Sequence, residues 1–569
     1  MLSGRVTLGL AVTILVVSCA TPPRWTPQTV APPETPPASI EQPAPLEKRV
    51  EPVSPSAAPE AGQPVKLTRD GALLTAIMNN RTIEVARLGP PIGETFVREA
   101  RAAFDPVVLG SVAVTHVESR QLLGSTSSAS ATTAIQPQTP IQTSLTQLEQ
   151  AIAALEGPQK QLLKTDATSG SVAIQEIFPT GTRLSISQSA ASIDTNLLGD
   201  TSQNGWVVSV DQPLLRGAGL AVNLVTLRQA KNTAAQSQYA LKNTVLGIAE
   251  QVELGYWNLV LGTEVVKIRE FAVKLADEQL KLNEERLNVG KAIEGDVMAS
   301  QAEKATRQAD LVDAQAAVRR QTVALIQLLN PDGAEPWKIT FEPADKPLVA
   351  QRPVDPGVSE QLALEYRPEL AQAKLNLANL DLAIAQAKNG LLPQLDVVSS
   401  FGTSGAIGGT TGASSSLSTS TIGDDAFNYQ IGLQVTTPIL YRAERARYRR
   451  AMLFQKQGER SLADLEQTVA SQVRQAVVEV ERQWERIGAT GVAVQSRTEQ
   501  LRVAQGRFDV GKVSNLDLLL VQRDFIQSQV DDATARVNYT QGLISLYASE
   551  GTLLERRGVS LETAGDSDS

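Results

Sequence analysis

Two short segments of the chain carry the same ionisable side chains at the same spacing. Arg286 to Lys291 reads Arg-Leu-Asn-Val-Gly-Lys, and Arg507 to Lys512 reads Arg-Phe-Asp-Val-Gly-Lys. A carboxylate follows each segment, Asp296 in the first copy and Asp517 in the second. Carboxylates that are brought together attract cations and repel one another, so these two aspartates are candidates for a cation-attracting site.

The two segments belong to a longer internal repeat. Gln301 matches Gln522 at the same offset (507 − 286 = 221 residues), and Gln308 matches Gln529. Chance is a poor explanation for agreement that runs this far without a gap. The sequence therefore predicts two copies of one helical-hairpin module.

Gly290 and Gly511 are suited to the chain reversal inside each hairpin, because glycine accepts a positive φ. Asp296 and Asp517 would then begin the returning helices, where a carboxylate interacts favourably with the helix dipole. This structural role and a role in cation attraction at the tip are both open at this point.

Very long helices must position these turns. Proline is absent between Pro213 and Pro331 and again after Pro438, and the segments 222–288 and 441–508 predict helices on the order of 100 Å each. Apolar residues at heptad spacing indicate a coiled-coil seam with an antiparallel neighbour. They are Leu311, Val318 and Leu325, with Ala314 and Leu328 on the second seam position, which the polar Gln321 interrupts. Shorter helical patterns at 68–88 and 358–389 open the two halves.

Segments with strand-like alternation precede both long helices. Tyr429 to Thr436 alternates well, and 206–213 alternates partially. Further candidates are 107–118, 171–178, 182–189 and 394–401, with loops expected at 119–143 and 402–424. Such segments fit a transmembrane β-barrel, and a soluble β-domain is the alternative. Residues 144–164 look briefly helical, and whether the extra hairpin of the region 119–204 extends the barrel or stands outside it is open.

The first residues predict export and a lipid anchor. Arg5 precedes a short apolar run that ends at Cys19, the only cysteine, so no intrachain disulfide can form. The pattern resembles a bacterial lipoprotein signal, whose cysteine is acylated, and a plain secretory signal is the alternative. The proline-rich segment that follows predicts an extended tether.

Composition excludes several other classes. The net charge of −9 gives no support to nucleic-acid binding, and a single histidine, His116, cannot build a histidine-based metal centre or a catalytic triad. No phosphate-binding loop is present. We therefore expect no enzymatic activity, no metal site, no cofactor besides the lipid, and no catalytic residues.

The duplicated order of helix, strands, long helix, turn and shorter helix resembles the TolC-like outer membrane efflux family, lipoprotein branch, over about residues 68–555. The motifs that carry the resemblance are Asp211 to Gly217, Thr437 to Leu440, the pair Tyr256-Trp257, and Val-Gly-x(5)-Asp at Val289 to Asp296 and Val510 to Asp517. The resemblance implies an α+β membrane protein, with long antiparallel coiled-coil helices forming a periplasmic tunnel and strands that contribute to a shared trimeric β-barrel.

The resemblance further implies a homotrimer in the bacterial outer membrane that works with a periplasmic adaptor and an inner-membrane pump. The adaptor would dock at Val289, Gly290, Lys291, Val510, Gly511 and Lys512, and Asp296 and Asp517 would lie near the tip constriction. The chain departs from the family pattern at Leu520, where a second Asp is expected, and at Val513, where an Arg is sometimes found. Ion-pair locking of the tip is therefore in doubt.

These expectations divide the chain into a signal peptide (1–18), a tether with acylated Cys19 (19–66), a first repeat (67–330), a linker (331–357), a second repeat (358–555) and a polar tail (556–569). The function expected is an exit duct for drugs, metal ions or secreted protein. The alternative is a lipid-anchored coiled-coil scaffold or adaptor of the periplasm.

Overall fold

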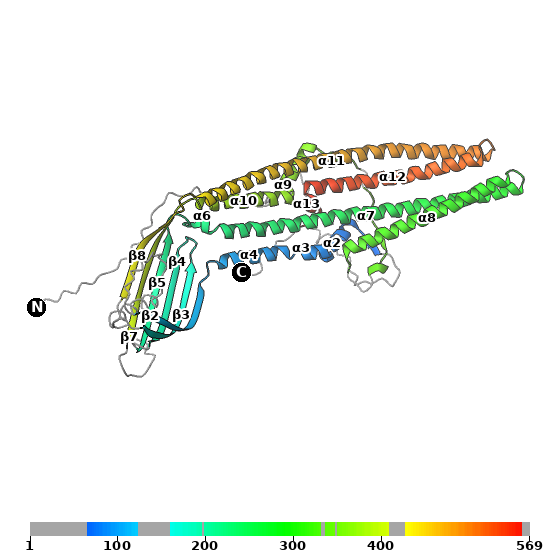
Figure 1. Ribbon diagram of the computed structural model, residues 1–569. Helices are drawn as coiled ribbons and strands as arrows, with labels where there is room; N and C mark the ends of the chain where they lie inside the picture. The colour runs from blue at the N-terminus through cyan, green and yellow to red at the C-terminus, as the bar shows by residue number, and fades with distance from the viewer. Residues whose placement is uncertain are drawn as a thin grey trace.

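The computed structural model describes residues 65–122, 160–195, 199–331, 336–347, 350–408 and 427–559. Within them, a helical bundle extends from one end of a β-sheet (Figure 1). The expected anchor residue Cys19, the signal peptide and nearly all of the tether lie outside the described residues.

Two helical hairpins form the far part of the bundle, as the sequence predicts. α7 (Val225–Asn288) packs along α8 (Glu294–Leu329), and α11 (Arg442–Asp509) packs along α12 (Asn515–Glu550). At about 1.5 Å per residue, the 64 residues of α7 span roughly 95 Å. The expected heptad seam of α8 faces α7, where Gln321 Nε2 donates to the Gly255 carbonyl at 3.1 Å.

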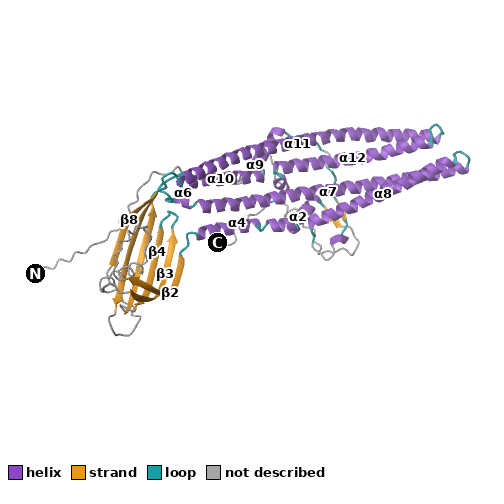
Figure 2. Ribbon diagram, in the orientation of Figure 1, coloured by secondary structure: helices purple, strands orange, loops and turns teal. Residues whose placement is uncertain are grey.

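Shorter helices flank the part of the bundle that is nearer the sheet (Figure 2). They are α2 (Arg69–Asn79), α3 (Arg81–Ala86), α4 (Gly89–Ala102), α6 (Leu220–Asn223), α9 (Pro356–Tyr366), α10 (Pro368–Asn389) and α13 (Leu553–Arg557). The expected helix 358–389 is divided because Pro368 disfavours a helical conformation at Arg367, whose ψ is 121°.

The core of the bundle lies where these short helices meet the long ones. Tyr256 is fully buried, and its hydroxyl donates to the Leu67 carbonyl at 3.2 Å and to Asp345 Oδ2 at 2.8 Å. Leu67 and its neighbours form β1 (Val65–Leu67), which pairs in parallel with β6 (Phe341–Pro343) after the short 3-10 helix Pro336–Lys338. This small sheet joins the end of the expected tether to the expected linker.

A six-stranded antiparallel sheet adjoins the bundle, in the order β2-β3-β4-β5-β7-β8. Its strands are β2 (Val107–Leu122), β3 (Lys160–Ile177), β4 (Arg183–Thr195), β5 (Gly199–Pro213), β7 (Gln394–Gly408) and β8 (Phe427–Thr436). β3 pairs with β4 from Thr165 to Ile177, so the extra hairpin of the region 119–204, β3–β4, is part of this sheet.

Three expectations for this region were wrong in part. Residues 160–164, expected to be helical, begin β3, and 144–159 lie outside the described residues. Residues 119–122 and 402–408, expected to lie in loops, belong to β2 and β7, and the rest of both expected loops lies outside the described residues. These residues are extended because their backbones pair with neighbouring strands. Their side chains have no strong preference for a strand, so the sequence of the segment alone does not predict this pairing.

Candidate functional site

The two hairpin turns have the same backbone geometry. Gly290 has φ 70° and Gly511 has φ 71°. The amide of Lys291 donates to the Arg286 carbonyl at 2.7 Å, and that of Lys512 donates to the Arg507 carbonyl at 2.8 Å. Both turns are therefore Schellman motifs, which end a helix with glycine in the left-handed region.

Each expected constriction aspartate occupies the third position of a returning helix. Asp517 accepts a hydrogen bond from the Ser514 hydroxyl at 2.6 Å, while its own amide donates to Ser514 Oγ at 3.2 Å. Asp296 Oδ2 accepts from the backbone amide of Ile293 at 3.4 Å. The structural role foreseen for both carboxylates is thus present, and it leaves Asp517 exposed and Asp296 half-buried.

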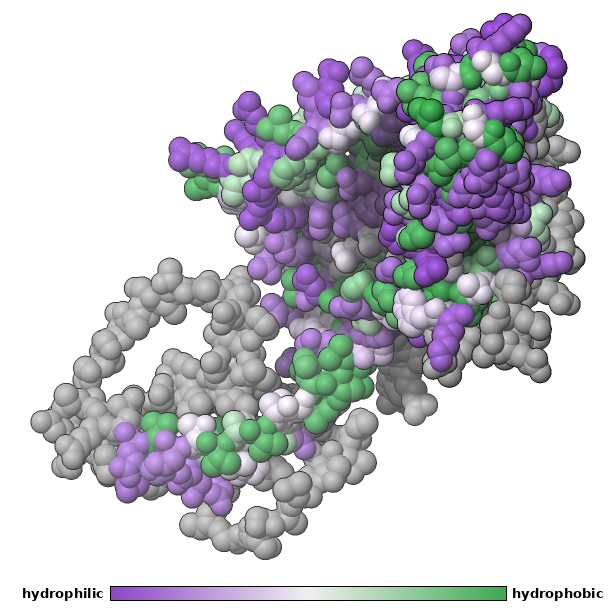
Figure 3. Space-filling view, turned by 90° about the vertical axis from the view of Figure 1, so that its right-hand side faces the viewer, coloured by the Kyte–Doolittle hydropathy of each residue, from purple (hydrophilic) through white to green (hydrophobic). Residues whose placement is uncertain are grey.

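The six expected docking residues lie together at the ends of the two hairpins, and all are exposed. Val289 and Val510 are each 68% exposed, although nothing in a helix turn requires an apolar side chain there. Ile293 and Leu516, which the sequence did not single out, add exposed apolar side chains beside them. The view from the tips shows a largely hydrophilic surface with scattered apolar groups (Figure 3).

A buried polar cluster joins the two hairpins just behind the tips, and sequence reasoning missed it. Asn515 Oδ1 accepts from Gln279 Nε2 at 3.1 Å and from Asn283 Nδ2 at 2.9 Å. Asn515 Nδ2 donates to the Asp296 carbonyl at 3.1 Å and to Ser300 Oγ at 3.2 Å. The amides at 279 and 283, one helical turn apart, are the only signal the sequence offered.

Arg286 of the repeated motif also links the hairpins. Its guanidinium lies 4.1 Å from the centroid of the Phe508 ring and donates to the Phe508 carbonyl at 3.2 Å. It also lies 3.4 Å from Asp509 Oδ1. Because Phe508 replaces the aliphatic Leu287 of the first copy, only one of the two motifs offers this aromatic partner.

Further from the tip, an ion-pair triad joins α7 to α8. Asp277 accepts from Lys281 at 2.8 Å and from Lys304 at 2.6 Å. These two hydrogen-bonded ammonium groups lower the pKa of Asp277 to about 2. The carboxylate therefore stays charged throughout the physiological range.

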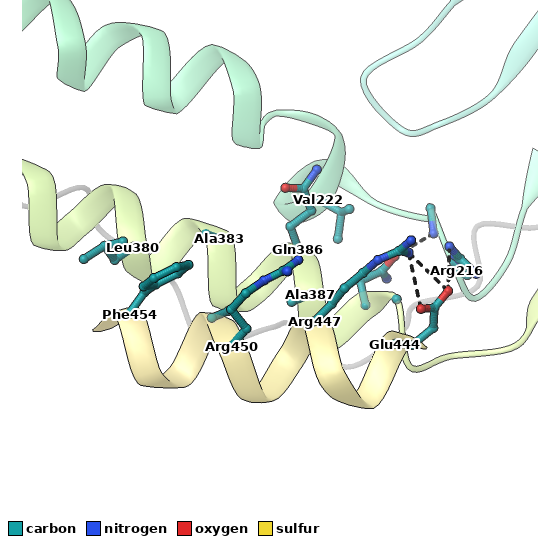
Figure 4. A pocket seen from close by; sticks show the side chains of 14 residues that line it. Arg216, Val222, Leu380, Ala383, Gln386, Ala387, Glu444, Arg447, Arg450 and Phe454 are labelled. Carbon is teal, nitrogen blue, oxygen red and sulfur yellow. Dashed lines mark hydrogen bonds and ion pairs between the residues drawn. The ribbon is translucent and has the colours of Figure 1, made fainter. Parts of the chain in front are cut away.

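A hollow of 520 Å³ lies at the other end of the bundle, where α10, α11 and the loop after β5 meet (Figure 4). Glu444 pairs there with Arg447 at 3.3 Å and with Arg216 at 3.7 Å, while Arg450 lines the same hollow. The expected motif ending at Gly217 forms this junction, and Gly217 has φ 83°. The ion pairs connect the strand-to-helix loop to the start of α11.

Over the part of the chain that the structure describes, no group of three or more metal-ligating side chains comes together. Among the same residues, no helix has the length and apolar character to cross a membrane.

Comparison with known proteins gives consistent results. Residues 360–552 match the family model described as outer membrane efflux protein. The chain is 24% identical over 298 residues to the outer membrane efflux protein BepC of Brucella suis biovar 1, a match that covers 51% of this chain and 60% of that protein.

The fold is shared with solved outer membrane proteins. The CmeC outer membrane channel of Campylobacter jejuni superposes with a TM-score of 0.59 at 14% identity, covering 85% of this chain and 86% of CmeC. VceC of Vibrio cholerae gives a TM-score of 0.57 at 14% identity, covering 85% and 96%. The hairpin tips and the sheet-to-helix order agree with these matches: residues 360–552 are similar to the outer membrane efflux protein family, and the fold is that of the solved outer membrane channels.

Proposed function

We propose that the protein is the outer-membrane duct of a tripartite efflux or secretion system. Three copies would enclose one passage, with the sheets in the outer membrane and the helical hairpins reaching through the periplasm. Substrates would cross passively, with energy supplied by an inner-membrane pump. The observation that carries this proposal is the joining of a two-faced sheet to hairpins roughly 95 Å long that end in exposed apolar turns.

The two faces of the sheet differ as a membrane-embedded wall requires. On β8, Tyr429, Ile431 and Leu433 point to one face and are 71–76% exposed, while Gln430 and Gln434 point to the other. A soluble protein has no reason to expose such a row. Alternation of apolar and polar residues along each strand is the pattern of a barrel between lipid and an aqueous lumen.

The hairpin tips would receive the adaptor. Val289 and Val510 are the apolar anchors of this proposed contact, with Lys291 and Lys512 beside them. Burial of an exposed valine on docking contributes about 1.5–3 kcal/mol, so two such anchors in each of three copies can hold a partner.

Cys19 would carry the covalent lipid, since it follows the short apolar run as a lipoprotein cysteine does. Labelling cells with a palmitate analogue should tag the wild-type protein and leave Cys19→Ala untagged. Labelling of the variant would refute the anchor without touching the duct.

The duct itself is tested by detergent extraction from outer membranes, native mass measurement and recording in planar lipid bilayers. A trimer with discrete conductance steps is the expected result. A monomer without conductance would favour the alternative, a lipid-anchored coiled-coil scaffold or adaptor.

A further inference from the structure

We propose that strand β2 of one copy pairs with strand β8 of the next, so that all six strands enter the barrel wall. Three copies of the six-stranded sheet then supply eighteen strands. This inference rests on the trimeric duct proposed above and defines its width. The competing arrangement leaves β2 and β3 outside the wall, which would then hold four strands from each copy.

Strand directions permit the closure. β2 leaves the helical bundle and β8 returns to it, and every neighbouring pair between them is antiparallel. The two edge strands therefore run in opposite directions, so the β8 edge meets the β2 edge of the next copy as an antiparallel pair. An even number of strands per copy is what a continuous up-and-down barrel needs.

Both edges are open and lack the devices that block pairing. β8 carries no charged residue and no proline from Phe427 to Thr436. On β2 the first Asp, Glu, Lys or Arg after Val107 is Glu118, far from the helices. Val112 and Val114 of this strand are 81% and 78% exposed. Edges that must remain single usually carry charges or proline, so these two edges are built to be paired.

The faces of the two edges also agree. Following the ladder registers across the sheet, one face collects apolar side chains from all six strands: Val108, Val112, Val114, Val172, Ile174, Ile186, Trp206, Val208, Phe401, Tyr429, Ile431 and Leu433. On β4 this face is the more exposed one, while Ala191 and Ile193 of the opposite face are 7% and 2% exposed. We therefore assign the apolar face to the outside of the barrel.

The registers between neighbouring strands already contain the tilt of a closed barrel. Val107 lies at the helix end of β2. Following the ladder partner from strand to strand across the sheet gives Gln175, Ser185, Ser209, Ser400 and finally Gln430 of β8. The helix end of β8 is Thr436, six residues further along (436 − 430 = 6). A stagger of six residues over six strands gives a tilt of about 35°, within the usual range for outer-membrane barrels.

This stagger fixes the register between copies. If the helix ends of the edges are level, Thr436 of one copy lies opposite Val107 of the next, and Gly432 lies opposite Ser111. The apolar faces then coincide, because Ile431 lies opposite Val112.

The height of the apolar face fits a membrane. From Val107 to His116, whose ring pairs with Asp166 of β3, nine residues rise about 30 Å along the strand and about 24 Å along the barrel axis. The usual apolar band of an outer-membrane barrel is about 25 Å. Beyond it, Glu118 pairs with Lys164 at 2.7 Å, as expected for side chains that have left the lipid.

The consequence is a wide lumen whose middle is uncharged, with Arg183, Asp211 and Asp396 on the inner face at the helix end. Eighteen strands spaced about 4.8 Å apart at this tilt give a diameter of about 34 Å, against about 22 Å for twelve. Serine and glutamine line the middle of the inner face, at Ser171, Ser187, Ser209, Ser400 and Gln430. The middle of the barrel would thus admit bulky substrates without selecting by charge, so selection falls to the helical part of the duct.

Disulfide crosslinking tests the register. Ser111→Cys and Gly432→Cys in one chain place two small inner-face positions opposite each other between copies, and a side chain at 432 meets nothing within 4 Å. Oxidation of intact outer membranes should convert most of the protein into covalent dimers and trimers on a non-reducing gel. Ala113→Cys with Gly432→Cys reports the same pairing slipped by two residues. Each single-cysteine variant controls for reaction with Cys19.

The matched rival is Ser187→Cys with Gly432→Cys, which lie opposite if β4 is the edge. Crosslinking of this pair, or of no pair in a trimer that remains intact, overturns the eighteen-stranded barrel. A strand count of twelve in an electron cryomicroscopy map of the unaltered protein would do the same. If native mass shows a monomer, the proposed duct fails instead.

Discussion

Replacing Asn515 by alanine tests the buried polar cluster that joins the hairpins behind the tips. Asn515 is 4% exposed, and both atoms of its amide group are occupied by partners on α7 and α8. The alanine variant keeps the helix but removes every side-chain hydrogen bond between α12 and the first hairpin at this level. We expect the two hairpins to separate more readily there.

The size of the effect follows from which partners are left unpaired. Asn283 Nδ2 retains the Ser300 hydroxyl at 2.7 Å, whereas Gln279 Nε2 retains only a contact of 3.5 Å to Asn283 Oδ1. One buried donor is therefore left without a good partner, which costs about 1–3 kcal/mol. A loss of about 2 kcal/mol in the free energy of local opening corresponds to about thirtyfold faster amide exchange.

Hydrogen–deuterium exchange of the solubilised protein, followed at 279–300 and 507–522, measures this opening directly. Leu516→Ala is the matched control, because Leu516 is 63% exposed on the same turn. Replacing Gln279, Asn283 and Asn515 together by leucine should restore much of the protection, since it removes the buried polar groups as a set. Unchanged exchange in Asn515→Ala would refute the idea that this cluster holds the hairpins together.

Three further predictions concern the scaffold of the tips and of the bundle. Arg557→Met should lower stability by about 3–5 kcal/mol in thermal unfolding, because Glu253 is fully buried and both its oxygens accept from Arg557, and adding Glu253→Gln should recover part of the loss. Asp277 has a pKa lowered to about 2, so its ion pairs stabilise the hairpin fully above the pKa of about 4 that the carboxyl has in the unfolded chain, and this stabilisation is lost as the pH falls toward 2. Asp277→Asn should remove this acid dependence of amide exchange. An identical acid profile in the variant would contradict the prediction. Gly511→Ala should destabilise the turn by about 1–2 kcal/mol through its positive φ alone, whereas Gly506→Ala, in open space within α11, should stabilise the helix, as urea melts of the two variants would show.

The long helices were predictable because their signals are local. Absence of proline placed α7 and α11 within a few residues of their observed bounds, Val225–Asn288 and Arg442–Asp509, and heptad spacing indicated the seam of α8. The turns were predictable for the same reason, since a Schellman motif needs glycine at one position, which Gly290 and Gly511 fill.

The bounds of the strands were harder to predict because they depend on pairing with strands that are distant in the sequence. Residues 160–164 and 402–408 contain side chains with no strong preference for a strand. They are extended because β2 pairs with the first segment and β5 and β8 pair with the second. The polar cluster around Asn515 escaped for a similar reason. Its members come from three helices, and nothing in the spacing of Asn515 on its own helix indicates α7.

The two repeated aspartates, equivalent in the sequence, are unequal in the structure, and this inequality predicts different roles. Asp517 is capped by the Ser514 hydroxyl and stays exposed, whereas Asp296 reaches back to the Ile293 amide and is half-buried. Only an exposed carboxylate keeps its charge available to ions in a passage. Asp517→Asn should therefore change cation block in bilayer recordings while leaving amide exchange of the turn nearly unchanged, and Asp296→Asn should speed exchange of the first turn more than it alters block. A larger change in cation block for Asp296→Asn than for Asp517→Asn would contradict this reasoning. It would show that Asp296 lies nearer the ion path, and that the exposure of a carboxylate in one copy does not predict its exposure in the trimer.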